Sequence, residues 1–338
     1  MPWQWLELST ANLSVVAPPN TSAGFSYRAG RVDAWNGMAA LGTSVYMAGV
    51  GGHADWAGNE AYRCDLAAAN PVWTMLNQPT PDASIRTDVT HYADGRPTSS
   101  HTYYSLHGDA LRGKIFRFGI GSAWGSGNFQ RPNVDAFDLA RNDWDAANTW
   151  PSVPEAISYA KSQVQHPLTG DTYVVGASYL WRFTRASGSW ARLAALPNNG
   201  SAAYYRAAVL DTRRNAIVIL GDHYRQPAGV LIYDIAANTW ANNRSLSGAQ
   251  AATVTAQAGH AAHYNAAVDR YIVKTNVAGQ VIAVDPVTLE ATVLATTGGT
   301  NVPQAVNGVF GKFVAMPQLG GYAYQPNGSA KLWFLAAP

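Results

Sequence analysis

The residues of this chain best suited to chemistry are the histidine, tyrosine and arginine side chains that recur between its apolar runs. Imidazole titrates near neutrality, and a tyrosine hydroxyl can relay a proton when nearby cations lower its pKa. Arginine binds carboxylates through a planar fork of donors, and 18 of the 23 basic residues are arginine. These residues predict proton transfer on an anionic substrate. The expected acid–base groups are His101, Tyr205 and Tyr264, and the expected carboxylate-binding groups are Arg206 and His263.

A second set of residues is expected to bind the substrate. Tryptophan rings would stack on sugars, and arginine and lysine would hold carboxylates or sulfates. The members of this set are His53, Trp56, Arg96, Tyr104, Trp124, Tyr159, Lys161, His223, Tyr224 and Arg225.

The elements that must position these residues are short strands. Apolar, β-branched and aromatic runs recur in groups of four, separated by Gly, Asn, Asp and Pro, without a helical stripe of useful length. Such four-stranded units are typical of β-propeller blades, which bury their apolar faces by stacking around an axis. We therefore expect one all-β propeller domain over residues 1–338. Its six antiparallel blades would span about 34–77, 101–147, 158–196, 203–245, 260–296 and 306–338.

The two ends of the chain are predicted to close the ring. The last unit supplies three strands, and residues 3–8 offer the missing outer one, with a Trp followed by Leu as in the outer-strand run 189–193. Pairing residues 3–8 with the C-terminal blade would remove two strand edges at once. An alternative with seven blades requires residues 12–16 to belong to a degenerate unit.

The first blade carries a family resemblance. Gly51-Gly52, then Tyr62 about ten residues on, then Trp73 near the outer strand resemble a Kelch repeat, and Gly221, Tyr233 and Trp240 form a weaker version. The chain is therefore similar to the Kelch and galactose-oxidase-like propellers. That class includes oxidases, lyases and binding modules, so the resemblance implies the fold and leaves the function open.

The unusual residues gather on one predicted face of the ring. The loops that precede the inner strands and those between the second and third strands hold them, whereas the loops of the opposite face are plain turns. Tyr, His or Asn occupies the start of most inner strands, where a core would favour Val, Ile or Ala. Two interpretations are open: a ligand funnel lined by these groups, or a polar plug whose members bond to one another across the channel.

Several propeller chemistries fit these residues poorly. A galactose-oxidase-like copper radical site uses a cysteine that precedes the Gly pair, whereas Cys64 follows it. Sialidase-like turns of the form Ser-x-Asp-x-Gly-x-x-Trp are absent. A glycosidase needs paired acids near the axis, yet Asp55, Glu60 and Asp222 lie in predicted loops. The histidines could bind a divalent metal from different blades, but no pair on one strand is spaced to chelate, so we expect no metal and no cofactor.

Propeller polysaccharide lyases use similar sets of Tyr, His and Arg. This resemblance implies a lyase that cleaves an anionic, uronate-containing glycan by β-elimination, with Tyr or His as acid and base. The alternative is a non-catalytic glycan- or protein-binding Kelch-like propeller of the lectin or adhesin type. The axial position of the His and Tyr residues favours the enzyme, because loop tips alone suffice for binding.

Composition narrows the partners and the compartment. A net charge of +2 predicts no nucleic-acid binding, and the lack of an 18-residue apolar run predicts no membrane span. Cys64 is the single cysteine, so no intramolecular disulfide forms. We expect a monomer that binds an anionic polysaccharide or oligosaccharide. The expected compartment is extracellular or periplasmic with a signal removed, the alternative being cytoplasmic.

Overall fold

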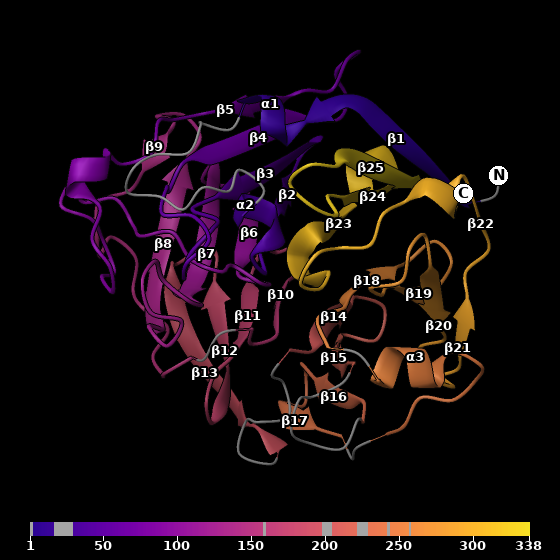
Figure 1. Ribbon diagram of the computed structural model, residues 1–338. Coiled ribbons are helices and arrows are strands. Elements are labelled where there is room, and N and C mark those ends of the chain that lie inside the picture. The colour runs from indigo at the N-terminus through magenta and orange to yellow at the C-terminus, as the bar shows by residue number, and fades with distance from the viewer. Residues whose placement is uncertain are drawn as a thin grey trace.

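Six sheets arranged around a central axis form a β-propeller (Figure 1). The computed structural model describes residues 3–16, 30–157, 160–197, 205–221, 229–241, 244–256 and 258–338. Each blade is a meander of four antiparallel strands, numbered here from the axis outward. The six-bladed, all-β prediction is confirmed.

The first three blades follow one another directly in the chain. In each of them, strands that are consecutive in the sequence are neighbours in the sheet. Blade one consists of β2 (Ala39–Leu41), β3 (Ser44–Ala48), β4 (Ala61–Asp65) and β5 (Trp73–Met75). Blade two consists of β6 (Leu106–Asp109), β7 (Lys114–Ile120), β8 (Arg131–Asp138) and β9 (Asp143–Trp144). Blade three consists of β10 (Gln163–Gln165), β11 (Thr172–Val175), β12 (Tyr179–Thr184) and β13 (Ser189–Ala195).

The remaining blades complete the ring. Blade four consists of β14 (Ala207–Asp211), β15 (Ala216–Leu220), β16 (Leu231–Asp234) and β17 (Thr239–Trp240). Blade five consists of β18 (Ala261–Asn265), β19 (Arg270–Lys274), β20 (Val281–Val284) and β21 (Ala291–Val293). Blade six consists of β23 (Phe313–Met316), β24 (Gly321–Tyr324), β25 (Lys331–Ala336) and β1 (Trp3–Asn12), with β22 (Thr296–Thr297) beside β1.

Helices are short and lie in the connections. The α-helices are α1 (Leu13–Val16), α2 (Gly30–Asp33) and α3 (Ala251–Thr255). The 3₁₀ turns are η1 (Asp82–Ser84), η3 (Gly299–Asn301), η4 (Phe310–Lys312) and η5 (Pro317–Leu319).

The N-terminal strand closes the ring as predicted. β1 pairs with β25 in antiparallel register, with Trp5 opposite Leu335 and Leu8 opposite Leu332. Trp5 is buried against the rings of Phe313 and Tyr324. β1 also pairs with β22 in parallel, so the closure reaches one connection further than residues 3–8 alone would. Figure 1 shows β1 running beside β25 at the edge of the ring.

Two local expectations are corrected by the structure. Residues 13–16 form α1 rather than a strand, so the described residues contain six blades and no seventh sheet. The inner strand expected from His101 begins only at Leu106, which leaves residues 101–105 as a loop at the start of blade two. That loop carries His101 and Tyr103.

Apolar side chains fill the space between neighbouring blades. β14 and β15 are buried at every position, because both faces of the inner sheet meet a neighbouring blade. Blades two and three share the rings of Phe116, Phe118 and Phe183. Cys64 is buried in the cluster of blade one, and burial raises the pKa of its thiol to about 12. The cysteine is therefore a packing residue.

Three of the five lysines are buried within this frame. Lys274 donates from Nζ to the carbonyls of Thr275 and Val277, and Lys312 donates to those of Val306 and Gly308. Burial lowers the pKa of Lys274 and of Lys312 to about 7, and that of Lys161 to about 8. The ammonium groups of Lys274 and Lys312 thus serve as donors to loop carbonyls at a cost in desolvation.

These lysines predict that stability rises with pH. The unfolded chain keeps its lysine protons up to the ordinary pKa of 10.5, whereas the folded chain loses them from about 7 upward. The unfolded state therefore binds more protons within this window, and the free energy of unfolding should increase by about 2 kcal/mol for each of the two lysines between pH 7 and pH 9. Urea denaturation at the two pH values measures the difference. Lys274→Met should reduce the rise, and a wild-type stability that is flat over this range would contradict the prediction.

Candidate functional site

A left-handed residue stands two to four positions before every inner strand. These residues are Trp35, Tyr103, Ala160, Tyr205, Gly259 and Phe310, with φ values of 48°, 46°, 56°, 59°, 74° and 45°. Bulky side chains rarely adopt this conformation, so its recurrence in all six blades identifies a built feature. Backbone hydrogen bonds link successive members around the axis, for example from Tyr103 N to Trp35 O and from Gly259 N to Tyr205 O, each at 2.9 Å.

Aromatic rings from these positions close the axis at this end of the propeller. The ring of Tyr103 lies 5.1 Å from that of Phe310 and 6.0 Å from that of Tyr205, and Tyr205 lies 5.8 Å from Phe310. Tyr104 is also buried and donates from its hydroxyl to the carbonyl of His260. The rings of Tyr103, Tyr205 and Phe310 therefore pack against one another at the axis, as in the plug interpretation.

A chain of polar groups begins at the hydroxyl of Tyr103. Nε2 of His101 is 2.9 Å from Oδ2 of Asp55, and Nδ1 of His101 is 3.4 Å from the hydroxyl of Tyr103. The His101 side chain is only 4% exposed, and its ring packs 5.0 Å from Trp35. Burial lowers the pKa of His101, while the neighbouring Asp55 opposes that shift. The imidazole is therefore neutral at pH 7, with one nitrogen facing a carboxylate and the other a phenol.

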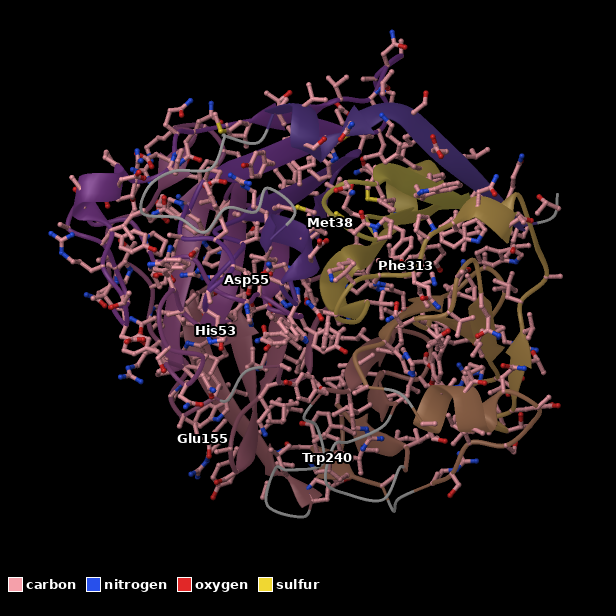
Figure 2. The ribbon with its side chains drawn as sticks, viewed as in Figure 1. Met38, His53, Asp55, Glu155, Trp240 and Phe313 are labelled. Carbon is pink, nitrogen blue, oxygen red and sulfur yellow. The ribbon has the colours of Figure 1, made fainter. Side chains whose placement is uncertain are left out.

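His53 joins this group from the loop that carries Asp55. Its ring lies 6.0 Å from that of His101, and its side chain is exposed. Figure 2 shows His53 and Asp55 near each other, with Glu155 and Trp240 further away toward the edge of the molecule. We call Trp35, His53, Asp55, His101, Tyr103 and Tyr205 the axial cluster.

Backbone contacts between loops of blades one and two fix the cluster. His53 donates from N to the carbonyl of Ala123 at 2.8 Å, and His101 donates to that of Ser122 at 3.0 Å. Asp55 N donates to Gly52 O, which tightens the turn that presents both His53 and Asp55. The site is therefore built on main-chain hydrogen bonds rather than on free loop tips.

Gly52 is the point of closest approach between these loops. A Cβ there would lie 2.2 Å from Ser122 O, and φ is +82°. Gly52→Ala should therefore lower the free energy of unfolding by about 2–4 kcal/mol, combining backbone strain with overpacking. Chemical denaturation measures the loss. Gly95→Ala is the matched control, because Gly95 has a φ of +84° with no atom within 4 Å of the added Cβ. Equal losses in the two variants would contradict this account.

A buried ion pair supports the same loop from below. Arg31 Nε lies 2.6 Å from Glu60 Oε1, and both side chains are at most 1% exposed. Glu60 also accepts from Trp56 Nε1 and from the Tyr62 hydroxyl. The Arg31 guanidinium lies 3.7 Å from the centroid of the Trp56 ring, which follows Asp55 in the chain. Trp56 is 1% exposed, so its ring packs in the interior instead of facing solvent, where a sugar would stack.

Other predicted residues have side chains that are buried or paired. Trp124 lies beside His53, with which it forms a backbone bridge, and it is 5% exposed. Arg96 pairs with Asp143 on the outer strand β9. Arg206 is 2% exposed and donates to the carbonyl of Ile219 inside blade four. These side chains have structural partners because the loops fold back onto the blades.

Two predicted catalytic residues of blade five are also separated from the cluster. His263 points toward blade six, where Nε2 lies 2.9 Å from Phe313 O. Tyr264 donates to Asp269 in the turn after β18, at the opposite end of the inner strand from its start. The grouping of His263 and Tyr264 with His101 is therefore corrected. Tyr159, His223, Tyr224 and Arg225 lie outside the described residues.

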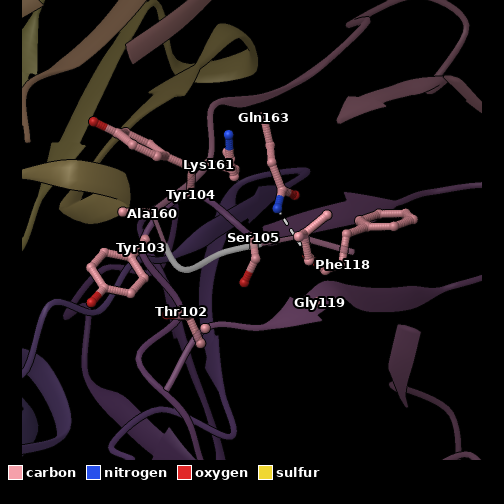
Figure 3. A pocket seen from close by; sticks show the side chains of 11 residues that line it. Thr102, Tyr103, Tyr104, Ser105, Phe118, Gly119, Ala160, Lys161 and Gln163 are labelled. Atoms are coloured by element: carbon pink, nitrogen blue, oxygen red, sulfur yellow. Dashed lines mark hydrogen bonds between the residues drawn. The ribbon is translucent and has the colours of Figure 1, made fainter. Parts of the chain in front are cut away.

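Lys161 and Tyr104 contribute instead to a small pocket between blades two and three. The pocket is also lined by Thr102, Tyr103, Ser105 and Gln163. Figure 3 shows the hydroxyls of Tyr103 and Tyr104 directed away from Lys161, Ser105 and Gln163. Gln163 donates to the carbonyl of Phe118, which narrows the pocket on that side. The hydroxyl of Tyr103 therefore faces His101 rather than this pocket.

Three members of the axial cluster were absent from the sequence-based site: Trp35, Asp55 and Tyr103. Asp55 follows His53 by two residues directly after a Gly pair, and Tyr103 follows His101 by two. Both pairs could have been recognised from the sequence as polar residues close to a predicted site residue. What the sequence could not supply was the contact between the two loops.

Among the described residues, no helix is both long and apolar enough to cross a membrane. Comparison with known proteins adds no assignment, because no protein-family model matches the chain and no curated protein is similar to it in sequence.

Proposed function

We propose that the protein is a polysaccharide lyase that cleaves a uronate-containing glycan by β-elimination at the axial cluster. The observation that supports this proposal is the chain from Asp55 through His101 to the Tyr103 hydroxyl, at 2.9 and 3.4 Å. An acid–base histidine oriented by a carboxylate and next to a hydroxyl is the arrangement that activates an oxygen for proton transfer. A merely binding surface has no need of it.

The elimination follows from these contacts. With Nε2–H donated to Asp55, Nδ1 of His101 accepts the Tyr103 proton, and the phenolate removes the hydrogen at C5 beside the uronate carboxylate. The C4–O bond breaks as the C4=C5 double bond forms. Tyr205, whose ring lies beside that of Tyr103, donates its proton to the leaving oxygen. Exchange with water then returns one proton to Tyr205 and removes one from His101.

The expected arginine contribution does not take part in this scheme. Arg206 and Arg96 are held by Ile219 and Asp143 respectively, away from the axial cluster. Neutralisation of the uronate carboxylate therefore requires another group.

We also propose membership of the Kelch-like propellers. Gly52, the second residue of the Gly pair, accepts from Asp55 N in the turn that presents His53 and Asp55. Trp73 lies on the outer strand β5, as the Kelch pattern expects, and pairs with Cys64 of β4. In this motif, Trp73 contributes to packing and Gly52 to the geometry of the site.

A panel of uronate polysaccharides tests the proposed activity. Cleavage by elimination produces a C4=C5 double bond, seen as a rise in ultraviolet absorbance, without uptake of water. Alginate-, pectate- and glycosaminoglycan-type polymers cover the main uronate linkages. New reducing ends without absorbance would indicate hydrolysis, and binding without cleavage would favour the lectin-type alternative. Either result overturns the lyase proposal.

A further inference from the structure

We propose that His53, Asp55 and His101 bind one divalent transition-metal ion. One ligand atom from each residue lies within 4.8 Å of the others, and the His101–Asp55 pair is already at 2.9 Å. Ligands about 2.1 Å from a metal are themselves about 3.0–3.5 Å apart, so a small closing movement of His53 completes the site. Within the described ranges, this is the one cluster of three or more such side chains with this spacing.

The ligands come from a framework that is already fixed. His53 has a φ of 44°, and its N and O both bond to the loop of blade two, through Ala123 and Gly125. His101 is held by Ser122 in the same loop. These main-chain bonds fix the positions from which the three side chains converge. Such preorganisation lowers the entropic cost of binding.

The three ligands differ in exposure, so an ion bound to them would be open to solvent on the side of His53 and Asp55. His101 is 4% exposed, the Asp55 side chain is 31% exposed, and His53 is exposed. The ring of Trp35 covers His101 on the inner side. Three protein ligands with open positions toward solvent are typical of catalytic rather than structural metal sites. Two imidazoles and one carboxylate suit Zn²⁺ or Mn²⁺ better than Ca²⁺ or Mg²⁺, which prefer oxygen ligands.

The outer nitrogen of His101 has the partner that such a ligand requires. A metal-bound histidine normally donates its other N–H to an oxygen. With Nε2 on the ion, Nδ1 carries the proton and faces the Tyr103 hydroxyl at 3.4 Å. With the ion bound, Nδ1 cannot accept the Tyr103 proton; that proton is released to solvent, and Nδ1–H donates to the resulting phenolate.

A cation here also supplies the charge that the predicted arginines do not. The carboxylate of a substrate can occupy the open positions beside His53, which neutralises it next to the acidic C–H. This role rests on the proposed lyase function, whereas the binding of the ion itself does not.

Calorimetric titration of untagged protein, first dialysed against EDTA, tests the site with ZnCl₂ and with MnCl₂ separately. One equivalent of at least one ion should bind. His53→Ala should weaken that binding by about 100-fold or more, since it removes an exposed ligand without touching the core. His166→Ala is the control, because His166 lies in the turn between β10 and β11 and should leave affinity unchanged.

The outcomes separate this inference from the proposed function. Failure of both ions to bind, or equal affinity in wild type and His53→Ala, overturns the metal site. Metal binding that depends on His53, without double-bond formation on any uronate polymer, overturns only the lyase proposal. Elimination by EDTA-treated protein that binds neither ion would support the lyase and reject the metal.

Discussion

Arg31→Met is expected to lower the free energy of unfolding by about 3–5 kcal/mol, the loss typical of a buried charge deprived of its partner. Glu60 would remain buried at 1% exposure without the guanidinium that lies 2.6 Å away. The Trp56 and Tyr62 donors bond to the same carboxylate but carry no positive charge. The variant also removes the cation above the Trp56 ring.

Urea denaturation with matched variants measures this effect. Arg63→Met breaks the pair with Asp65, at 3.0 Å but 44% and 36% exposed, and should cost less than about 1 kcal/mol. The double variant Arg31→Met/Glu60→Leu should recover part of the loss, because it removes both buried charges. A loss below about 1 kcal/mol in Arg31→Met would show that the pair is not essential to the fold.

The Arg31–Glu60 pair also supports the turn that carries Asp55 of the axial cluster. The carbonyl of Trp56 accepts from Gly52 N, and Asp55 N donates to Gly52 O, so movement of Trp56 displaces the carboxylate that faces His101. We therefore expect Arg31→Met to weaken metal binding as well as the fold. The same buried group supports both.

The fold was predictable because its signals are local and repeated. Four-strand groups, turn residues between them and an orphan Trp-containing strand at residues 3–8 suffice to predict a closed ring. The start of an inner strand was misplaced where polar residues precede it, as at residues 101–105. There the left-handed residue Tyr103 interrupts the strand, and no propensity of tyrosine predicts that conformation.

The site was predictable only in part because side-chain direction depends on contacts between blades. His53, His101 and Tyr205 were identified from their loops, and the structure brings them together with Asp55 and Tyr103. Arg206 directly follows Tyr205 yet points into blade four, since successive residues near a strand face opposite ways. Tyr264, expected beside His101, lies near the far end of its strand, because that strand already begins at Ala261.

Tyr103→Phe is expected to reduce the rate of uronate elimination by about 100- to 10,000-fold, the contribution typical of a positioned acid–base group. The substitution removes only the hydroxyl, so the ring contacts with Phe310 and Tyr205 remain. Its hydrogen bond to His101 is long at 3.4 Å, and the loss of stability should stay within about 1 kcal/mol. Initial rates of ultraviolet absorbance measure the change.

Tyr233→Phe is the matched control, because its hydroxyl bonds to Asn238 in blade four and takes no part in the axial cluster. His101→Gln should lower kcat as strongly as Tyr103→Phe, and the double variant should lose little more, since the two groups act on the same proton. A Tyr103→Phe enzyme with wild-type kcat would remove Tyr103 from the mechanism. If His101→Gln alone were inactive, the proton would pass directly from substrate to imidazole, and the phenol would serve only to orient the ring.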